Sequence, residues 1–335
     1  MTKFSAEVLK IDPQAVSQRM QSAIRGIVID RLRRRGVVVG LSGGIDSSVT
    51  AAICVRALGA KRVFGIFMPE EDSSSDSLQL GRILARSLGI ETVLEDIGPT
   101  LRALGCYRRR DDAIRTVIPE YGDGWKSKIV LPSVLDSSPY ALFSVVAQSP
   151  TGEIKKARMS ADAYLGVVAA TNFKQRTRKM IEYYHADRLW YAVAGTPNRL
   201  EYAQGFFVKN GDGAADFKPI AHLYKSQVYD LARFLEVPQE IISRPPTTDT
   251  YSLEQTQEEF YFAVPLELLD LCLYAKNHQV DVAQVSTATG LTEEQVKRVY
   301  ASIDSKIRVS QYLHSKALLI EEVDEVKVMA TKGAC

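Results

Sequence analysis

An apolar run that breaks into a glycine-rich turn constrains this chain more than any other feature. Val37, Val38 and Val39 are consecutive β-branched residues, typical of a buried strand. They lead into Gly40-Leu41-Ser42-Gly43-Gly44-Ile45-Asp46-Ser47-Ser48, after which small or apolar residues recur at helical spacing. The pattern predicts a buried strand, a tight loop and a helix, in that order.

The chemistry of the tight loop is suited to an anion. Gly43 and Gly44 permit backbone dihedrals that are closed to other residues, and they let a ligand approach the main chain. Ser42, Ser47 and Ser48 place hydroxyls beside the free N–H groups of a helix start. The loop is not a Walker loop, because no Gly-Lys-Ser/Thr follows, and the spacing Gly-x-Gly-x-x-Gly is absent. The alternative interpretation is a simple tight turn in which Asp46 complements the helix dipole.

Composition limits the class of protein. A chain of 335 residues that is 46% hydrophobic can bury a substantial core, in one large domain with additions or in two domains. A net charge of +2 is too mild to indicate a nucleic-acid partner. Neither a signal peptide nor an apolar run long enough for a bilayer is visible, so we expect no membrane association.

The cysteines agree with a reducing compartment. The four cysteines, Cys54, Cys106, Cys272 and Cys335, are scattered without a Cys-x-x-Cys pair. This spacing indicates neither a disulfide framework nor a zinc cluster. We therefore expect a cytoplasmic protein.

Strand and helix patterns alternate in the first part of the chain. An amphipathic helix is predicted over residues 12–35, with Asp12 as its N-cap. After the loop helix come an apolar strand at 62–67, a polar loop at 70–77, a helix at 78–88 closed by Gly89, and a short strand at 91–94. This alternation predicts an α/β fold with a doubly wound parallel sheet.

The rhythm changes between residues 105 and 156. β-Rich runs at 128–131 and 141–148, the second followed by a Ser-Pro-Thr-Gly turn, predict an inserted β-hairpin packed over or near the active cleft. Alternation then resumes: helices are predicted at 161–170 and, after Thr171-Asn172, at 173–184, with a strand at 190–194 and a helix at 226–235.

The last part of the chain, residues 265–323, is predicted to be mostly helical, and Thr292 with Gln295 forms a capping box. The spacing in 280–303 imitates a helix-turn-helix, but the second helix offers only Lys297 and Arg298, so compact helical packing is favoured over DNA binding. The predicted organisation is an N-terminal helix (1–35), a nucleotide-binding domain (36–104 and 157–262), the insertion (105–156) and a helical C-terminal region (263–335).

The loop at residues 42–47 resembles the pyrophosphate loop, Ser-Gly-Gly-x-Asp-Ser, of the ATP pyrophosphatase superfamily. Later stretches resemble the NAD synthetase family, and in the family's order. They are Asn172-Phe173-Lys174-Gln175-Arg176-Thr177-Arg178, Gly195-Thr196-Pro197-Asn198-Arg199-Leu200-Glu201, Gly205-Phe206-Phe207-Val208-Lys209-Asn210-Gly211-Asp212-Gly213, Pro219-Ile220 with Leu223-Tyr224-Lys225-Ser226-Gln227-Val228, and Pro246-Thr247. The resemblance covers residues 36–96 and 172–259, with a looser similarity at His314.

The resemblance implies an adenine nucleotide hydrolase-like sheet and an ammonia-dependent ligase. Such an enzyme uses ATP to adenylate the carboxylate of deamido-NAD, releases pyrophosphate, and lets ammonia displace AMP to give NAD. Two polyanions must meet, so cations and backbone dipoles are needed to neutralise them. No protein nucleophile is required.

By the same resemblance, roles fall on particular residues. Asp46 and Lys225 are implied to be catalytic, and Asp46 and Glu201 to hold Mg²⁺. The implied ATP-binding residues are Gly40, Leu41, Ser42, Gly43, Gly44, Ile45, Asp46, Ser47, Thr196, Lys225 and Thr247. The implied deamido-NAD residues are Arg176, Lys209, Asp212, Asp216 and His314.

Some positions depart from the family's pattern. Gln257-Glu258 stands where an Asp-Glu pair is usual, Leu200 precedes Glu201 in place of Ser or Ala, and Ser315 follows His314 where a lysine is common. The insertion is absent from the family's common short form. The chain shows no glutaminase region, so the resemblance implies free ammonia or a separate glutaminase partner, together with a homodimer.

Two other functions stay open from the sequence. One keeps the adenylation and changes the acceptor to a different carboxylate. The other is a nucleotide-binding regulator without turnover.

Overall fold

The computed structural model describes residues 4–135, 143–248, 250–321 and 323. Cys335, Asp249 and the first two residues of the strand predicted at 141–148 lie outside this range. Within it, no helix is both long and apolar enough to cross a membrane. Cys54, Cys106 and Cys272 are free and buried.

A parallel sheet of four strands lies at the centre, in the order β3-β2-β1-β7. Val37 of β1 is paired with Val63 of β2 on one side and with Ala192 of β7 on the other. The strands are β1 (Val37–Gly40), β2 (Val63–Phe67), β3 (Glu91–Leu94) and β7 (Ala192–Val193). The predicted strands at 37–39, 62–67 and 91–94 are therefore confirmed, and the one at 190–194 is shorter than predicted.

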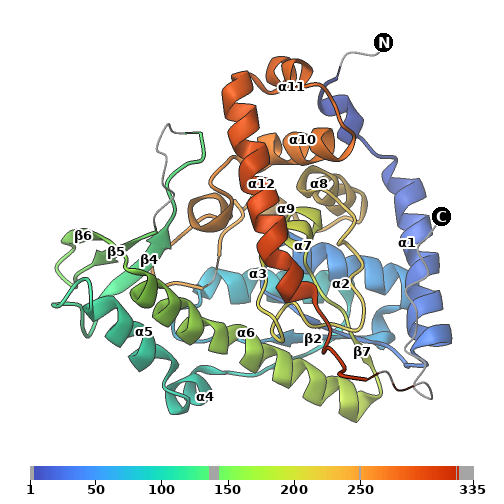
Figure 1. Cartoon of the computed structure of the whole chain (residues 1–335). Helices are drawn as coiled ribbons and strands as arrows, with labels where there is room; N and C mark the ends of the chain where they lie inside the picture. The colour runs from blue at the N-terminus through green and yellow to red at the C-terminus, as the bar shows by residue number, and fades with distance from the viewer. Residues whose placement is uncertain (1–3, 136–142, 249, 322, 324–335) are drawn as a thin grey trace.

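Helices cover both faces of this sheet (Figure 1). One face carries α1 (Pro13–Arg25), α2 (Ile45–Leu58), α3 (Ser75–Leu88), α8 (Lys225–Phe234) and α9 (Gln239–Ile242). The other carries α4 (Gly98–Ala103), α5 (Cys106–Arg115) and α6 (Ala161–Leu189). A doubly wound parallel sheet was predicted, and it is confirmed.

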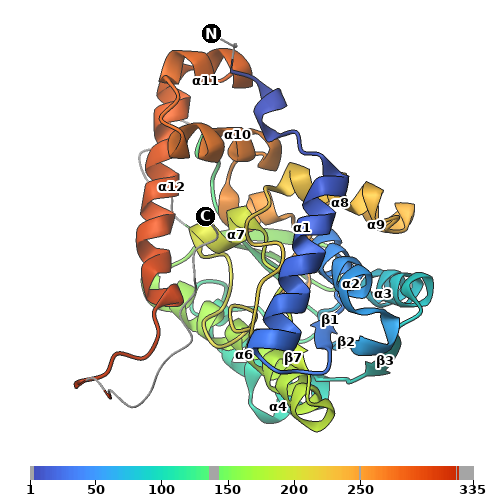
Figure 2. The ribbon, with the colours of Figure 1, turned by 90° about the vertical axis from the view of Figure 1, so that its right-hand side faces the viewer.

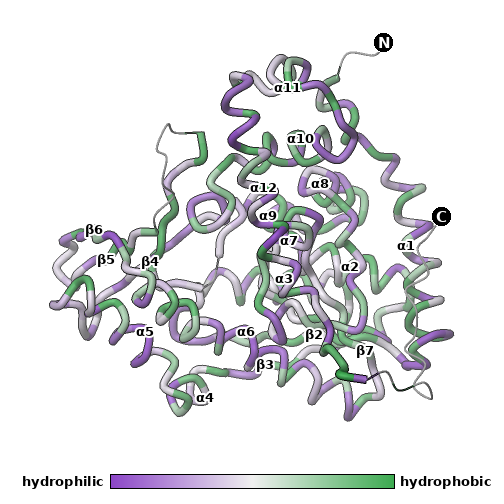
Figure 3. Tube along the Cα trace, viewed as in Figure 1, coloured by the Kyte–Doolittle hydropathy of each residue, from purple (hydrophilic) through white to green (hydrophobic). Residues whose placement is uncertain are grey.

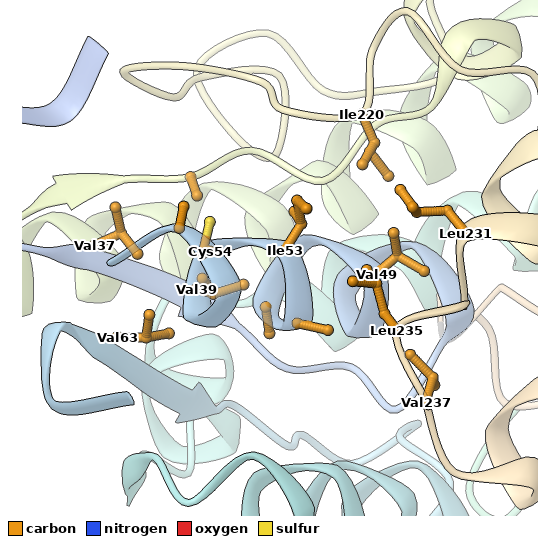
Figure 4. Packing of buried hydrophobic residues seen from close by; sticks show 14 of the residues in the cluster. Val37, Val39, Val49, Ile53, Cys54, Val63, Ile220, Leu231, Leu235 and Val237 are labelled. Atoms are coloured by element: carbon orange, nitrogen blue, oxygen red, sulfur yellow. The ribbon is translucent and has the colours of Figure 1, made fainter. Parts of the chain in front are cut away.

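The alternation of side chains along β1 explains the two layers. Val37 and Val39 are fully buried with α2, whereas Val38, also fully buried, packs with Phe64 and Ala186 on the opposite face. Figure 4 shows Val49, Ile53 and Cys54 of α2 between the strand residues and the apolar side chains of residues 220–237. A strand that is buried on both faces needs a continuous apolar run, which the sequence supplies.

Several helices differ from their predicted bounds, and α3 begins at Ser75, inside the loop predicted at 70–77. α1 is capped by Asp12, as predicted, but it passes into a π-helix at Gly26–Arg31. The predicted break at Thr171-Asn172 is wrong, because α6 is continuous over Ala161–Leu189. The Thr171 hydroxyl donates to the carbonyl of Val167, one turn earlier, so its polar group is satisfied inside the helix.

The segment 105–156 contains more structure than a hairpin. It begins with α5 and continues into a three-stranded antiparallel sheet in the order β4-β5-β6. These strands are β4 (Lys126–Val130), β5 (Ser144–Gln148) and β6 (Ile154–Arg158). The small sheet lies to one side of the parallel sheet, beyond α5 and α6 (Figure 1).

The C-terminal region is helical, as predicted, and packs around its own apolar core. It consists of α10 (Leu266–Asn277), α11 (Val282–Thr289) and α12 (Glu293–His314), preceded by a π-helix at Glu258–Phe262. The Thr292–Gln295 capping box is present at the start of α12. Figure 2 shows α12 running along one side of the molecule, past α7 (Arg199–Gln204).

The remaining elements are short. A 3₁₀ turn at Ala6–Leu9 precedes α1, and another at Ala60–Arg62 precedes β2. After α12 the chain is irregular, and Leu318, Leu319 and Ile320 are almost fully or largely exposed, which appears as a hydrophobic stretch in Figure 3.

Candidate active site

The strand order places a crevice at the carboxyl end of β1. The chain winds from β1 outward to β2 and β3, and then returns to β7 on the other side of β1. In open α/β sheets ligands bind where the winding direction reverses, outside the carboxyl ends of the strands. The glycine-rich loop follows β1 and the turn at 195–198 follows β7, so both predicted motifs reach this crevice.

The glycine-rich loop brings its backbone close to a neighbouring helix. Gly43 has φ +75°, and a Cβ there would stand 2.3 Å from the carbonyl oxygen of Ser77 in α3. The Ser42 hydroxyl lies 3.0 Å from that of Ser47 and accepts from the N–H of Gly44 at 3.3 Å. Only glycine fits at position 43, because both the conformation and the space exclude a side chain.

The start of α2 has the features that favour an anion. Gly44 is its N-cap, and among the described residues no side chain caps this end. The hydroxyls of Ser47 and Ser48 instead donate to the carbonyl of Gly44, at 3.0 and 2.8 Å. N–H groups at a helix start together with the helix dipole favour a phosphate.

Asp46, Lys225 and Glu201 come together beside this loop, as their common assignment required. The Lys225 ammonium lies 2.5 Å from Oδ2 of Asp46, and the amide of Asn198 donates to Oδ1 at 3.0 Å. Asn198 and Glu201 form the capping box of α7. The cluster thus combines residues from α2, α7 and α8. Its contact between Asp46 and Asn198 joins residues that are 152 positions apart in sequence.

Glu201 is a buried carboxylate with an altered proton affinity. Burial, with the nearby charge of Asp46, raises its pKa to about 8, while Lys225 and the amide of Gln257 act in the opposite direction. The Gln257 amide donates to Glu201 Oε1 at 2.9 Å. Burial therefore favours the protonated form of Glu201 more than that of an exposed glutamate.

Lys225 keeps its positive charge although it is buried. Burial alone would lower its pKa, but the carboxylates of Asp46 and Glu201 overcome this and raise it. Its backbone is fixed by Asp270, a fully buried residue of α10 that accepts from the N–H groups of Lys225 and Ser226 at 3.1 and 2.8 Å. Burial raises the pKa of Asp270 to about 6.

Two carboxylates from this cluster are oxygen ligands of the kind that Mg²⁺ prefers. Over the residues that the structure describes, His, Cys, Asp and Glu nowhere gather in threes as a preformed all-protein metal site would need. Mg²⁺ commonly binds one or two carboxylates and completes its shell with water and substrate phosphates. Asp46 and Glu201 fit that pattern.

A cavity of about 710 Å³ opens between the segment at residues 71–83 and the segment at residues 240–254. Its lining includes Glu71, Asp72, Arg244 and the predicted ATP residue Thr247. Arg244 donates to the hydroxyl of Ser77, the residue against which Gly43 packs, so α3 connects the cavity wall to the glycine-rich loop, although no residue of that loop lines the cavity. Thr196 is half-buried in the turn after β7, two residues before Asn198.

The residues predicted for deamido-NAD form a second, looser group. Arg176 is exposed on α6, and its Nε donates to the carbonyl of Lys209 at 3.3 Å. The Lys209 ammonium donates to Tyr312 O and Ser315 Oγ, both at 2.8 Å. Asp212 accepts from the N–H of Val208 at 2.8 Å, and burial raises its pKa.

Asp216 and His314 both make hydrogen bonds within the protein. The Asp216 carboxylate accepts from the N–H of Val193 at 2.7 Å and from the Tyr183 hydroxyl at 3.3 Å, which ties its loop to β7. His314 lies edge-on to Tyr202, with Nε2 at 2.8 Å from that residue's carbonyl oxygen. Both residues border the loop after α7 without entering the Asp46 cluster.

Comparison with known proteins identifies the family of this chain. The family described as NAD synthase matches residues 16–116 and 145–312. A protein of Rhizobium meliloti (strain 1021), named NH(3)-dependent NAD(+) synthetase, is 59% identical over 324 residues, which is 97% of either chain. The chain belongs to the NAD synthase family. The resemblance inferred from the motifs is therefore confirmed.

More distant members extend the match. An NH(3)-dependent NAD(+) synthetase of Methanocaldococcus jannaschii is 32% identical over 274 residues, covering 81% of this chain and 85% of that one. Among solved structures, an NMN synthetase from Francisella tularensis has a TM-score of 0.65 at 22% identity and covers 92% and 99% of the two chains. The NH3-dependent NAD synthetase from Campylobacter jejuni has a TM-score of 0.60 at 21% identity, covering 93% and 100%. At such identities the structures support the fold.

Several polar residues that support the cluster in this NAD synthase family member were not predicted from the sequence. Asn198 carried a signal, since Asn-x-x-Glu is a capping pattern, but its bond to Asp46 was not foreseen. Asp270 gave no local signal, because its partners lie 44 and 45 residues away. Gln257 was noted only as a departure, yet it contacts Glu201 directly.

A buried ionic network was also missed. Lys174, only 1% exposed, contacts Glu70 at 3.0 Å and Asp72 at 2.6 Å. Arg110 of α5 lies 2.5 Å from Asp72, and the Tyr107 hydroxyl donates to Glu70 at 2.9 Å. Asp72 lines the cavity, so this network supports one of its walls.

Proposed function

We propose that this chain catalyses the ATP-dependent amidation of deamido-NAD to NAD, with ammonia as the nitrogen source. The observation that carries the proposal is the Asp46–Lys225–Glu201 cluster beside an uncapped helix start and a glycine-rich loop, in a member of the NAD synthase family. The near full-length identity to NH(3)-dependent NAD(+) synthetases supports the same conclusion.

The first chemical step joins two anions. An oxygen of the nicotinate carboxylate attacks the α-phosphorus of ATP, the bond to the bridging oxygen of the β-phosphate breaks, and pyrophosphate leaves. We assign the leaving pyrophosphate to the loop at residues 40–47, where backbone N–H groups and serine hydroxyls meet it. Lys225, charged and buried, adds a positive charge next to that loop.

The second step forms the amide. Ammonia attacks the carbonyl carbon of the acyl-adenylate, a C–N bond forms, the C–O bond to AMP breaks, and a proton passes to solvent. The residues of this chain need only hold the acyl-adenylate in place for this step. Arg176, Lys209, Asp212, Asp216 and His314 are our proposed contacts for the deamido-NAD part.

Mg²⁺ is part of the proposal. Asp46 and Glu201 would hold it with phosphate oxygens, and when bound it neutralises charge on the phosphates. Thr196 and Thr247 would contact ATP, the latter from the rim of the cavity. The residues of the glycine-rich loop, from Gly40 to Ser47, would contact the phosphates of ATP.

The proposed setting is a homodimer in the cytoplasm that takes ammonia from solution or from a separate glutaminase. The proposed partners are therefore small molecules, with a second copy of the chain. Neither nucleic acid nor membrane is proposed as a partner.

Incubation with Mg-ATP, deamido-NAD and either ammonium or glutamine tests the function. We expect NAD, AMP and pyrophosphate in equal amounts with ammonium, and little product with glutamine alone. Absence of product with ammonium would refute the assignment, and equal use of glutamine would refute the nitrogen source. Nicotinate mononucleotide, offered in place of deamido-NAD, tests whether a different carboxylate is the preferred acceptor. ATP binding without release of pyrophosphate from ATP, whichever acid is offered as acceptor, would indicate a regulator.

A further inference from the structure

Residues 247–248 and 250–257, named here the 247–257 loop, form part of the cavity wall and also reach the carboxylate cluster; residue 249 lies outside the described residues. Thr247 and Thr248 line the cavity, and Gln257 donates to Glu201. Thr247 pairs with Thr256, and the N–H of Thr248 donates to the carbonyl of Gln255 at 2.9 Å, which closes the loop at its base. Its position therefore affects both the shape of the cavity and the surroundings of Glu201.

One side of this loop is held by β4. The N–H of Ser127 donates to the Ser252 hydroxyl at 2.9 Å, and the N–H of Leu253 donates to the carbonyl of Ser127 at 3.2 Å. The amide of Gln255, which is 1% exposed, donates to the carbonyl of Ile129. Strand β4 falls in residues 117–144, between the two stretches that the NAD synthase family model matches.

The other side of the loop is held by Lys174. Its ammonium donates to the carbonyl of Thr250 at 2.8 Å in addition to contacting Glu70 and Asp72. Three donors of the ammonium thus have three partners, one on the loop and two on the segment before α3. Both segments border the cavity, through Thr248 and Asp72.

We propose that β4 and Lys174 are positioning elements that hold the 247–257 loop in its nucleotide-binding conformation before ATP arrives. This inference rests on the proposed function. A loop ordered in advance does not lose its conformational entropy on binding, so ATP binds more tightly. The inserted segment then acts on ATP affinity, while the chemistry stays with the Asp46 cluster.

Gln255→Leu tests the β4 side, and Lys174→Met tests the other. Neither residue lines the cavity, so neither substitution removes a cavity-wall group. In Gln255→Leu, loss of the single buried hydrogen bond to Ile129 is expected to raise KM for ATP about three- to tenfold, with kcat within about twofold of wild type. Amide hydrogen exchange in 247–257 should be faster in the ligand-free variants.

Glu120→Gln is the matched control. Glu120 pairs with Lys155 of β6, on the same inserted sheet, and both side chains are partly exposed. This variant should keep the wild-type KM for ATP and the wild-type exchange of the loop. An equal rise in KM for the control would overturn the proposal, because the effect would then be general to the insertion.

Three results decide the matter. A raised KM for ATP together with faster loop exchange in Gln255→Leu supports the proposal; an unchanged KM, or a fall in kcat alone, overturns it. Since Lys174→Met removes a buried cation and could unfold the chain, Gln255→Leu is the deciding variant. If wild-type protein makes no NAD, the proposed function fails by itself, and calorimetric binding of Mg-ATP to the same variants still tests the positioning.

Discussion

Replacing Gly43 by Ala tests whether the glycine-rich loop must approach α3 so closely. The Cβ of alanine would stand 2.3 Å from the carbonyl oxygen of Ser77, and that contact is backbone, which cannot rotate away. The positive φ of +75° adds a conformational penalty. Together we expect a loss of about 2–5 kcal/mol in the free energy of unfolding, about 1–2 from the left-handed backbone and the rest from overpacking.

Gly89→Ala is the matched control within the same fold. Gly89 ends α3 with φ +63°, but a Cβ there would meet nothing within 4 Å. It should lose only the conformational part, about 1–2 kcal/mol. The difference between the two variants isolates the contact between the loop and Ser77.

Urea unfolding of both variants gives the free energies, and steady-state kinetics gives KM for ATP. We expect Gly43→Ala to be less stable than Gly89→Ala and to bind ATP at least about tenfold more weakly, because the backbone N–H groups of the loop move. Equal stability losses, with a wild-type KM for ATP in Gly43→Ala, would refute the reasoning.

Further predictions concern the carboxylates. Asp46→Ala should abolish pyrophosphate release while the thermal unfolding curve stays cooperative, and measurable turnover would contradict its role. Because the pKa of Glu201 is raised to about 8, a cation must displace a proton below that pH, so Mg²⁺ should stabilise the ATP-bound protein more at pH 8.5 than at pH 6.5. Glu201→Gln should remove this difference in thermal shift, and an unchanged pH dependence would exclude Glu201 as a ligand. Asp270→Ala leaves the buried N–H groups of Lys225 and Ser226 without their acceptor and should cost about 2–4 kcal/mol of unfolding free energy by urea titration; a loss below about 0.5 kcal/mol would contradict this account.

The raised pKa of Glu201 also has a consequence for stability in the absence of metal. Its folded-state pKa lies above its unfolded value, so its contribution to stability is fully present below the unfolded pKa, near pH 4.5. That contribution is lost as the pH rises through about 8. Metal-free protein is thus expected to lose this contribution as the pH rises from about 4.5 to about 8, and Mg-ATP is expected to oppose the loss.

The sequence predicted best what depends on local pattern. The three valines form a buried strand because helices cover both faces of the sheet, and a run of apolar residues predicts this. Gly43 is required because its backbone has a positive φ and passes close to the carbonyl oxygen of Ser77. The break at Thr171 was wrong because a hydroxyl that bonds the preceding turn is compatible with a helix. β6 was missed because its Ile-Lys-Lys-Ala-Arg sequence lies at a sheet edge and lacks a clear apolar alternation.

The charged residues of the site could be predicted from the sequence, but the residues that hydrogen-bond to them could not. Asp46, Glu201 and Lys225 belong to motifs, so their meeting could be expected once the strand order was known. Their supports, Asp270 and Gln257, come from elements whose placement depends on tertiary packing. Nothing in the spacing of a single sequence encodes such long-range contacts.

The two halves of the site differ in how their polar groups are satisfied. In the ATP half, charges are buried and the helix start of α2 is uncapped by described side chains, so it offers free donors to phosphate. In the acceptor half, the Lys209 ammonium is held by Tyr312 and Ser315 and also lies 4.1 Å from the centre of the Tyr312 ring. If Lys209 binds deamido-NAD, the dinucleotide must replace those bonds to the end of α12, and a charge-assisted bond to phosphate is the kind of interaction strong enough to do so. On this proposal acceptor binding is coupled to the position of the C-terminal end of α12, whereas phosphate binding at the start of α2 displaces no side-chain cap among the described residues.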